Sequence, residues 1–194
     1  MKLTSRQTYK VVRAALERGR FKQVDLEEAA GVSFGLVNRA VRWMVSRKFV
    51  SKEGGQYEVI APAALAGAFS LFRQLGEARP SSFSVDADGK TLLKALKEHG
   101  AVLCLTSALS YYGDYPRDPV VSVYADKALA DSLKRMAPGG TRVEIFSDDL
   151  GQKGDFVEMR GVRLTSRVRT IIDLLCSEKS YAAGQLMKKT WEKA

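Results

Sequence analysis

The joint "AAGVSFGLV", residues 29–37, constrains the fold of this chain more than any other stretch. A short helix predicted in "QVDLEEAAGV" ends at Gly31, because glycine readily adopts the left-handed conformation that closes a helix. Two residues later, Ser33 has the hydroxyl that suits the cap of another helix, predicted over about 34–47. So short a turn brings the two helices close together, and we expect them to share one core.

The helix predicted over 34–47 is amphipathic, with apolar residues at helical spacing. The positions predicted to face the core are Val37, Val41, Met44 and Val45. The other face is predicted to carry Phe34, Gly35, Asn38, Arg39 and Arg42.

Flanking elements complete a domain over residues 1–60. The stretch "SRQTYKVVRAALERGRF" has apolar residues at helical spacing and is predicted to be a helix that ends at Gly19. Downstream, "FVSKE" and "QYEVI" flank Gly54-Gly55, a dipeptide preferred in two-residue hairpin turns. Three helices followed by a hairpin is the order of a winged helix-turn-helix. The joint resembles the helix-turn-helix of many prokaryotic transcription regulators.

In such a motif the second helix of the pair lies in the major groove of DNA. Asn38 has the amide that reads adenine, whereas Arg39 and Arg42 suit guanine or phosphate. Ser33 and the helix N-terminus suit a phosphate.

Two further candidate contacts flank these. Lys52 on the hairpin is predicted to bind the DNA backbone, which positions the domain without specifying a sequence. Phe34 would touch a thymine methyl or pack on the first helix, and Gly35 follows it on the same exposed face. The alternative is a solvated basic face that contacts protein.

Charge is unevenly distributed along the chain, which carries a net +9. Residues 1–60 hold 12 Lys and Arg against 6 Asp and Glu, whereas residues 61–194 hold 19 against 16. The positive excess therefore lies mainly in the first third. A basic domain beside a nearly balanced one indicates a polyanionic partner, here double-stranded DNA.

Residues 61–80 are predicted to form a linking helix, with Leu65, Phe69, Phe72 and Leu75 on one face and Pro80 at its end. Residues 81–194 alternate strand and helix patterns, which predicts an α+β domain with helices packed on a sheet. A non-catalytic nucleotidyltransferase-like fold is the more specific form that we consider for this domain.

Nucleotidyltransferases place a small-residue turn before a helix and two carboxylates, one residue apart, on the next strand. Thr106-Ser107-Ala108 supplies such a turn, and Thr106 or Ser107 is predicted to cap its helix. The next strand reads Val121-Ser122-Val123 without carboxylates, and Asp114, Asp118 and Asp126 only flank it. The Glu-x-Lys of restriction-type nucleases is also missing. We therefore predict no catalytic residue.

No metal site or cofactor is predicted either. The chain has one histidine, His99, expected at a helix C-terminus, and no C-x-x-C pair. Cys104 and Cys176 lie in apolar runs and are expected to be buried thiols. In "TSRVRTIIDLLC", Arg169 and Asp173 are spaced to pair across one helical turn.

The chain combines the predicted winged helix and the linking helix with the stretches "LTSALSYYGDY", "VYAD" and "GVRLTSRVRTIIDLL". In these features it resembles the AbiEi family of type IV antitoxins and related regulators. The resemblance spans nearly the whole chain. It implies repression of the protein's own operon through the winged helix, an antitoxin role for residues 81–194, and a nucleotidyltransferase toxin as partner.

The sequence thus predicts a DNA-binding transcriptional regulator without enzymatic activity. We expect a homodimer, since such motifs commonly read two half-sites. We also expect a cytoplasmic protein without membrane contact, because no stretch resembles a signal peptide or a membrane span. The alternatives are a nuclease or nucleotidyltransferase with an appended DNA-binding domain, and a protein-interaction module that binds its partner through the C-terminal domain.

Overall fold

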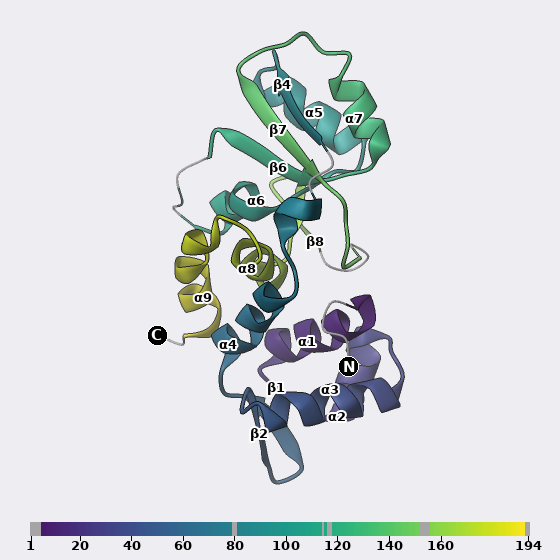
Figure 1. The fold of residues 1–194 in the computed structure, drawn as a ribbon, viewed down its shortest axis with the longest axis vertical. Helices are drawn as coiled ribbons and strands as arrows, with labels where there is room; N and C mark the ends of the chain where they lie inside the picture. Colours follow the sequence, from purple (N-terminus) through teal and green to yellow (C-terminus); the bar gives the residue numbers. More distant parts are fainter. Residues whose placement is uncertain (1–4, 79–80, 114, 116–117, 152–155, 193–194) are drawn as a thin grey trace. The chain divides into compact units, whose positions relative to one another are not determined.

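The computed structural model describes residues 5–78, 81–113, 115, 118–151 and 156–192 (Figure 1). The chain forms two compact units, residues 1–73 and 74–194. Helices and two separate sheets make up the structure, which confirms the predicted α+β class. None of the described helices combines the length and apolar character that a bilayer crossing requires.

The first unit packs three helices beside a small antiparallel sheet. The helices are α1 (Arg6–Arg18), α2 (Gln23–Ala30) and α3 (Phe34–Ser46). The strands are β1 (Arg20–Phe21), β2 (Val50–Glu53) and β3 (Gln56–Val59), in the order β1-β3-β2. Helix α1 begins where the Ser5 hydroxyl accepts the N–H of Thr8 and ends at Gly19. The side chains that share its core include Tyr9, Val12, Leu16, Leu26, Val37, Val41 and Met44.

The predicted joint between α2 and α3 is confirmed. Gly31 adopts the left-handed conformation, with φ of 59°, and its N–H donates to the Glu27 carbonyl at 2.9 Å. The prediction for Val45 was wrong, because this side chain is exposed and Ala40 is buried instead. Ala40 lies on the stripe of Val37 and Met44, whereas Val45 is about 100° around the helix from Met44.

The stretch predicted as one linking helix is broken into α4 (Pro62–Gly67) and two 3₁₀ turns, η1 (Ala68–Leu71) and η2 (Leu75–Ala78). Phe69 belongs to the first unit, where its ring packs edge-on against Tyr9 with centroids 5.9 Å apart. Phe72 ends η1 with φ of −132° and is 61% exposed, so the chain leaves the helical path before its side chain can join the apolar face. The predicted helix end at Pro80 lies outside the described residues.

The second unit is built on a six-stranded mixed sheet. Its strands are β4 (Ser81–Val85), β5 (Val102–Leu103), β6 (Val120–Tyr124), β7 (Thr141–Phe146), β8 (Phe156–Met159) and β9 (Val162–Thr165). Their order is β4-β7-β6-β5-β9-β8, with parallel pairing of β6 to β7 and of β5 to β9. The helices are α5 (Gly89–Glu98), α6 (Leu105–Tyr112), α7 (Lys127–Leu133), α8 (Arg167–Leu175) and α9 (Ala183–Trp191), with a 3₁₀ turn η3 (Ser180–Ala182) before α9.

The two faces of this sheet carry different layers. Alternate side chains such as Val123 and Ile145 join a core with leucines of α5 and α7. On the opposite face, the rings of Tyr124 and Phe146 pack together with centroids 6.3 Å apart. The guanidinium of Arg169, from α8, lies 4.9 Å from the Tyr124 ring. Helix α8 therefore covers the face opposite α5 and α7.

Arg169 is a buried cation held by three carboxylates. Its Nε lies 2.9 and 3.0 Å from the two Asp173 oxygens, which confirms the predicted pair across one turn of α8. Its terminal nitrogen Nη2 lies 3.5 Å from a carboxylate oxygen of Asp148 and 3.5 Å from one of Asp149, in the segment that follows β7. The Arg169 side chain is only 2% exposed, so this cluster joins that segment to α8 through a buried charge.

The helix after β5 begins differently from the prediction. Cys104 occupies the cap position of α6, and Leu105 has a φ of 51°. Thr106 and Ser107, predicted as caps, lie inside the helix, which already begins at Leu105. Their hydroxyls donate to the Asp118 carboxylate and the Val120 carbonyl. Other predictions hold: His99 is the C-cap of α5, and Cys104 and Cys176 are buried free thiols.

Replacing Asp173 with alanine should destabilise the protein by about 3 kcal/mol, because a buried guanidinium loses its closest carboxylate. The change in the free energy of unfolding is measured by urea unfolding of the full-length protein, followed with a signal from the second unit. The matched control is Glu98→Ala, which breaks an exposed i,i+4 pair with Lys94 and should cost less than about 0.5 kcal/mol. Equal costs for the two variants would contradict the structural role of the cluster.

Candidate nucleic-acid interface

The exposed face of α3 carries most of the residues predicted to contact DNA. This face is anchored from behind, because Val37, Val41 and Met44 are fully buried on the other side of the helix. Six of the seven predicted contact residues are exposed: Ser33, Phe34, Gly35, Arg39, Arg42 and Lys52. Asn38 is half-buried.

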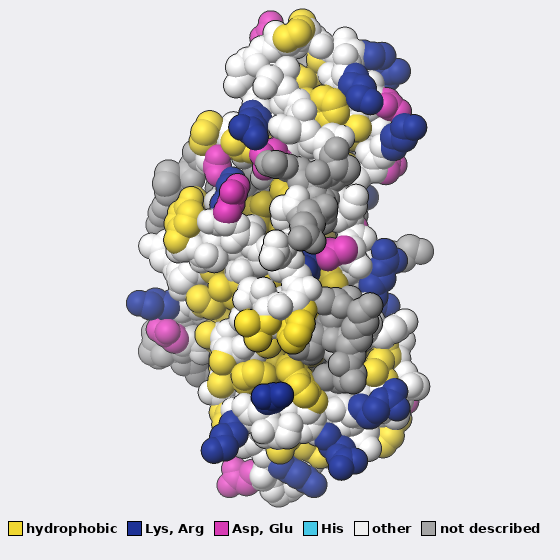
Figure 2. Space-filling view, viewed as in Figure 1, with side chains coloured by type: hydrophobic (Ala, Val, Ile, Leu, Met, Phe, Trp, Pro, Cys, Tyr) yellow, Lys and Arg dark blue, Asp and Glu magenta, His cyan; other side chains and the backbone are white. Residues whose placement is uncertain are grey.

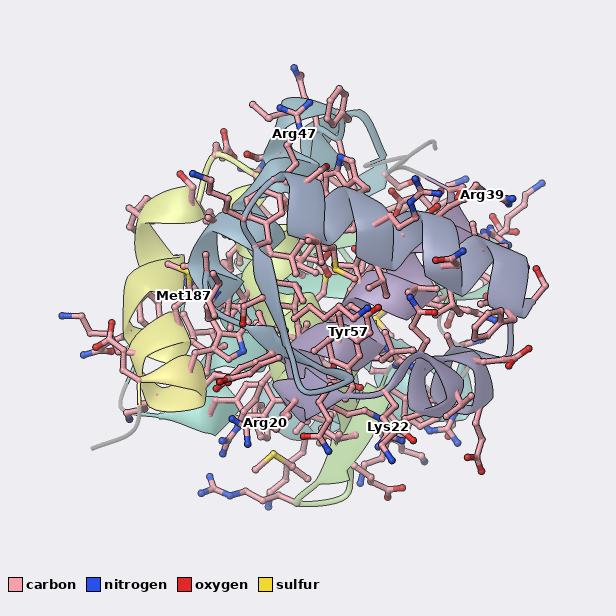
Figure 3. The ribbon with its side chains drawn as sticks, turned by 90° about the horizontal axis from the view of Figure 1, so that it is seen from below. Arg20, Lys22, Arg39, Arg47, Tyr57 and Met187 are labelled. Carbon is pink, nitrogen blue, oxygen red and sulfur yellow. The ribbon has the colours of Figure 1, made fainter. Side chains whose placement is uncertain are left out.

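Arg39 and Arg42 point their charge toward solvent. Within the part of the chain that the structure describes, neither side chain has an ion-pair partner. In Figure 3, Arg39 projects from the outer side of α3, away from Tyr57 and α2, and Arg47 marks the other end of the helix. Two unpaired guanidinium groups one helical turn apart form a surface that suits phosphate or the acceptor edge of guanine.

A polar chain behind α3 holds Asn38 in place. The Gln23 amide, at the start of α2, lies 3.5 Å from the Asn38 side-chain oxygen and 3.3 Å from the Tyr57 hydroxyl. Gln23 therefore connects α2, α3 and the hairpin. Because the Asn38 oxygen is the atom nearest Gln23, the NH₂ group of Asn38 is directed away from Gln23.

Sequence reasoning missed Gln23 and Tyr57. They are separated from each other by 34 positions in the chain, and neither belongs to a recognisable motif. Their roles appear only once β3 is paired beside β1, which places Tyr57 opposite Phe21. The two rings stack with centroids 5.7 Å apart, and this fixes Tyr57 against the core.

The hairpin forms as predicted, with Gly54 and Gly55 both at positive φ, 54° and 83°. Lys52 lies directly across from Tyr57 in the strand register, and its ammonium is 5.7 Å from the ring centroid. This cation–π contact orients a lysine that remains exposed at the surface.

Two acidic side chains limit where an anion can bind. The Glu27 carboxylate accepts the N–H of Phe34 at 3.0 Å, and Ser33, although it is the N-cap, makes no side-chain capping bond. A phosphate at this helix end would therefore meet a carboxylate. Arg20 is paired with Glu58 at 2.9 Å, and the hydrogen bond and charge of Glu58 raise the pKa of its guanidinium.

Lys and Arg side chains are also prominent on the space-filling surface. Figure 2 shows several of them over the end of the first unit that carries α2, α3 and the hairpin, with few acidic side chains between them. Such a surface attracts a polyanion over a range set by the salt concentration.

In the second unit, the described positions that invited comparison with a nucleotidyltransferase are buried or hydrogen-bonded within the chain. Ser122 and Val123 are buried in β6, while Asp118 binds Lys179 at 2.6 Å and Thr106 at 2.9 Å. Burial raises the pKa of Asp118, but its hydrogen bonds to Lys179, Val120 and Thr106 outweigh this and lower the pKa overall. Across the described residues, no three His, Cys, Asp or Glu side chains form a metal-binding group. Asp114 lies outside the described residues.

Comparison with known proteins adds no family to this description. No family model, no curated protein and no solved structure matches the chain. The functional interpretation therefore depends on the exposure, contacts and charge of the residues on α3 and the hairpin.

Substitutions on the exposed face of α3 should leave stability nearly unchanged. Phe34→Ala and Arg39→Ala should each alter the free energy of unfolding by less than about 0.5 kcal/mol, because neither side chain is buried. Met44→Ala, on the buried side of the same helix, should cost about 2–5 kcal/mol. Urea unfolding distinguishes them, and a cost for Phe34→Ala near that of Met44→Ala would show that Phe34 belongs to the core.

Proposed function

We propose that the first unit is a winged helix-turn-helix that binds double-stranded DNA, and that the protein is a transcriptional regulator. The observation that supports this most is the exposed pair Arg39 and Arg42 on a helix whose other side is fully buried. An arginine without an acidic partner is available for an external anion. Because the buried side of α3 is packed into the core, the helix backbone loses little further freedom when DNA binds.

In this proposal α3 enters the major groove with its N-terminal half against the bases. Arg39 donates to guanine, and the NH₂ group of Asn38 donates to an acceptor on a neighbouring base edge. Arg42, one turn further along, binds phosphate. Exposed Phe34 contacts a thymine methyl, and Gly35 leaves room for the helix to approach the DNA.

The hairpin serves as the wing. Lys52, oriented by the Tyr57 ring, binds the DNA backbone beside the groove that holds α3. Ser33, which is exposed, contributes its hydroxyl to binding of the DNA backbone. The Glu27 carboxylate already accepts the N–H of Phe34, so a phosphate does not bind at that N–H.

For the second unit we propose a non-catalytic role of the AbiEi type, on a nucleotidyltransferase-like fold. The absence of carboxylates from β6 and the engagement of Asp118 by Lys179 support a unit that does not transfer nucleotides. The expected partners are a second copy of the chain, which would place two α3 helices on two half-sites, and a nucleotidyltransferase toxin.

Arg39→Ala should weaken binding of the full-length protein to its preferred duplex by about 1–3 kcal/mol and relax the preference at one base pair. The duplex is first selected from a randomised pool, and affinities are then measured by fluorescence anisotropy. Arg39→Lys keeps the charge but loses the planar fork, so it should recover general affinity without the base preference. Lys52→Ala should weaken all duplexes alike and reduce the magnitude of the salt slope by about 1.

The control for net charge is Lys90→Ala, an exposed lysine at the start of α5 in the second unit. It removes one positive charge far from α3 in the sequence and should change affinity by less than about twofold. If the selected pool shows no enriched sequence, or if Lys90→Ala weakens binding as much as Arg39→Ala, the proposed site is wrong.

A further inference from the structure

A hollow of about 170 Å³ opens in the second unit between α5, α6 and the strands β5 and β6. Its walls are mainly apolar: Leu92, Leu93, Leu96, Leu103 and Val121. Apolar cavities of about 150 Å³ are large enough to hold benzene. The space therefore suits a molecule of about one ring.

The polar residues of its lining are Ser107, Ser110 and Tyr111 of α6, and Asp118, whose carboxylate accepts from Thr106 of the same helix. We call this part of the lining the polar end. Ser107 donates its hydroxyl hydrogen to the Val120 carbonyl at 3.3 Å and accepts the N–H of Ser122 at 2.9 Å. Ser107 is thus committed to joining α6 to β6.

Ser110 is different, because its hydroxyl donates to the Ser107 carbonyl at 3.0 Å but accepts from no donor in the described chain. Its oxygen therefore keeps acceptor capacity, and Ser110 is one of the residues that line the hollow. Asp118 accepts from Val120, Thr106 and Lys179, so among the described residues three of about four acceptor positions on its carboxylate are used. Tyr111 also lines the hollow.

The charge at this end is already balanced. The Lys179 ammonium lies 2.6 Å from the Asp118 carboxylate, so a second cation would gain little there. A neutral donor avoids the desolvation of a further charge and can use the acceptor on Ser110. The pocket therefore favours a neutral molecule whose apolar body carries one hydroxyl or N–H group.

We propose that this hollow binds a small, neutral, one-ring molecule with a single hydrogen-bond donor, for which phenol is the simplest probe. The donor points to Ser110 and the carboxylate of Asp118, and the ring lies among the leucines of α5. This site shares no residue with the proposed DNA interface, since all of its lining belongs to the second unit.

The test titrates ¹⁵N-labelled full-length protein with phenol and, separately, with toluene, which has a similar size and no donor. Phenol should give saturable amide shifts in α5, α6 and β6, with an affinity above that of toluene. Ser110→Ala should weaken phenol binding by about threefold to tenfold, the worth of one hydrogen bond, and leave toluene within about twofold.

Ser70→Ala is the matched control, because the exposed Ser70 hydroxyl makes the same bond to the carbonyl three residues earlier, 2.7 Å from the Gly67 oxygen, and does not line the hollow. It should leave both affinities unchanged. Ser110→Leu, which fills the polar end, should abolish binding of both ligands while amide spectra report a folded protein. Unsaturable shifts with phenol, equal affinity for toluene, or full phenol binding by either Ser110 variant would each overturn the proposal.

Discussion

The left-handed turn at Gly31 is the constraint on which the proposed interface depends. It ends α2 through its N–H bond to the Glu27 carbonyl and leaves only two residues before α3 begins. With so short a connection, α3 can bury its apolar stripe against α1 and α2 in only a narrow range of orientations. Any side chain other than glycine would be strained at this backbone geometry, although no neighbouring atom obstructs a Cβ there.

Once the apolar stripe is buried, the position of the cationic face follows. Arg39 and Arg42 lie on the far side of the helix from Val37 and Met44, so the packing that stabilises the unit also directs their charge outward. The bridge from Gln23 to Asn38 and Tyr57 adds polar contacts between α2, α3 and the hairpin. The buried side of α3 thus stabilises the unit, and its exposed side carries the proposed recognition residues. Substitutions on the exposed side can therefore alter DNA recognition with little loss of stability.

Sequence patterns predicted the elements better than their packing. Helical spacing, Gly19, Gly31 and the Gly54-Gly55 pair are local signals, and each marks an element end or turn that the structure contains. The exposure of Val45 and Phe72 was not predictable in this way. A position at the edge of an apolar stripe becomes buried only if a neighbouring element reaches it, and that depends on tertiary packing.

Polar contacts between residues close in the sequence were also predictable, whereas those between distant residues were not. Arg169 and Asp173 are four residues apart, so the spacing alone predicted their pair. The additional contacts with Asp148 and Asp149, like those of Asp118 with Lys179, join residues far apart in the chain and arise from the sheet order. In the candidate interface, the exposed residues of α3 were predicted from helical phase, whereas Gln23 and Tyr57 could not be, since strand pairing brings them together.

The central claim is that the outer face of α3 and the hairpin bind duplex DNA. Its most direct test is an amide-shift map of the ¹⁵N-labelled full-length protein during titration with the selected duplex. The account predicts that the largest shifts and line broadening cluster at residues 33–42 and 50–59, with the amides of α5 and α7 unaffected. Shifts confined to the second unit, or spread evenly over both units, would contradict it.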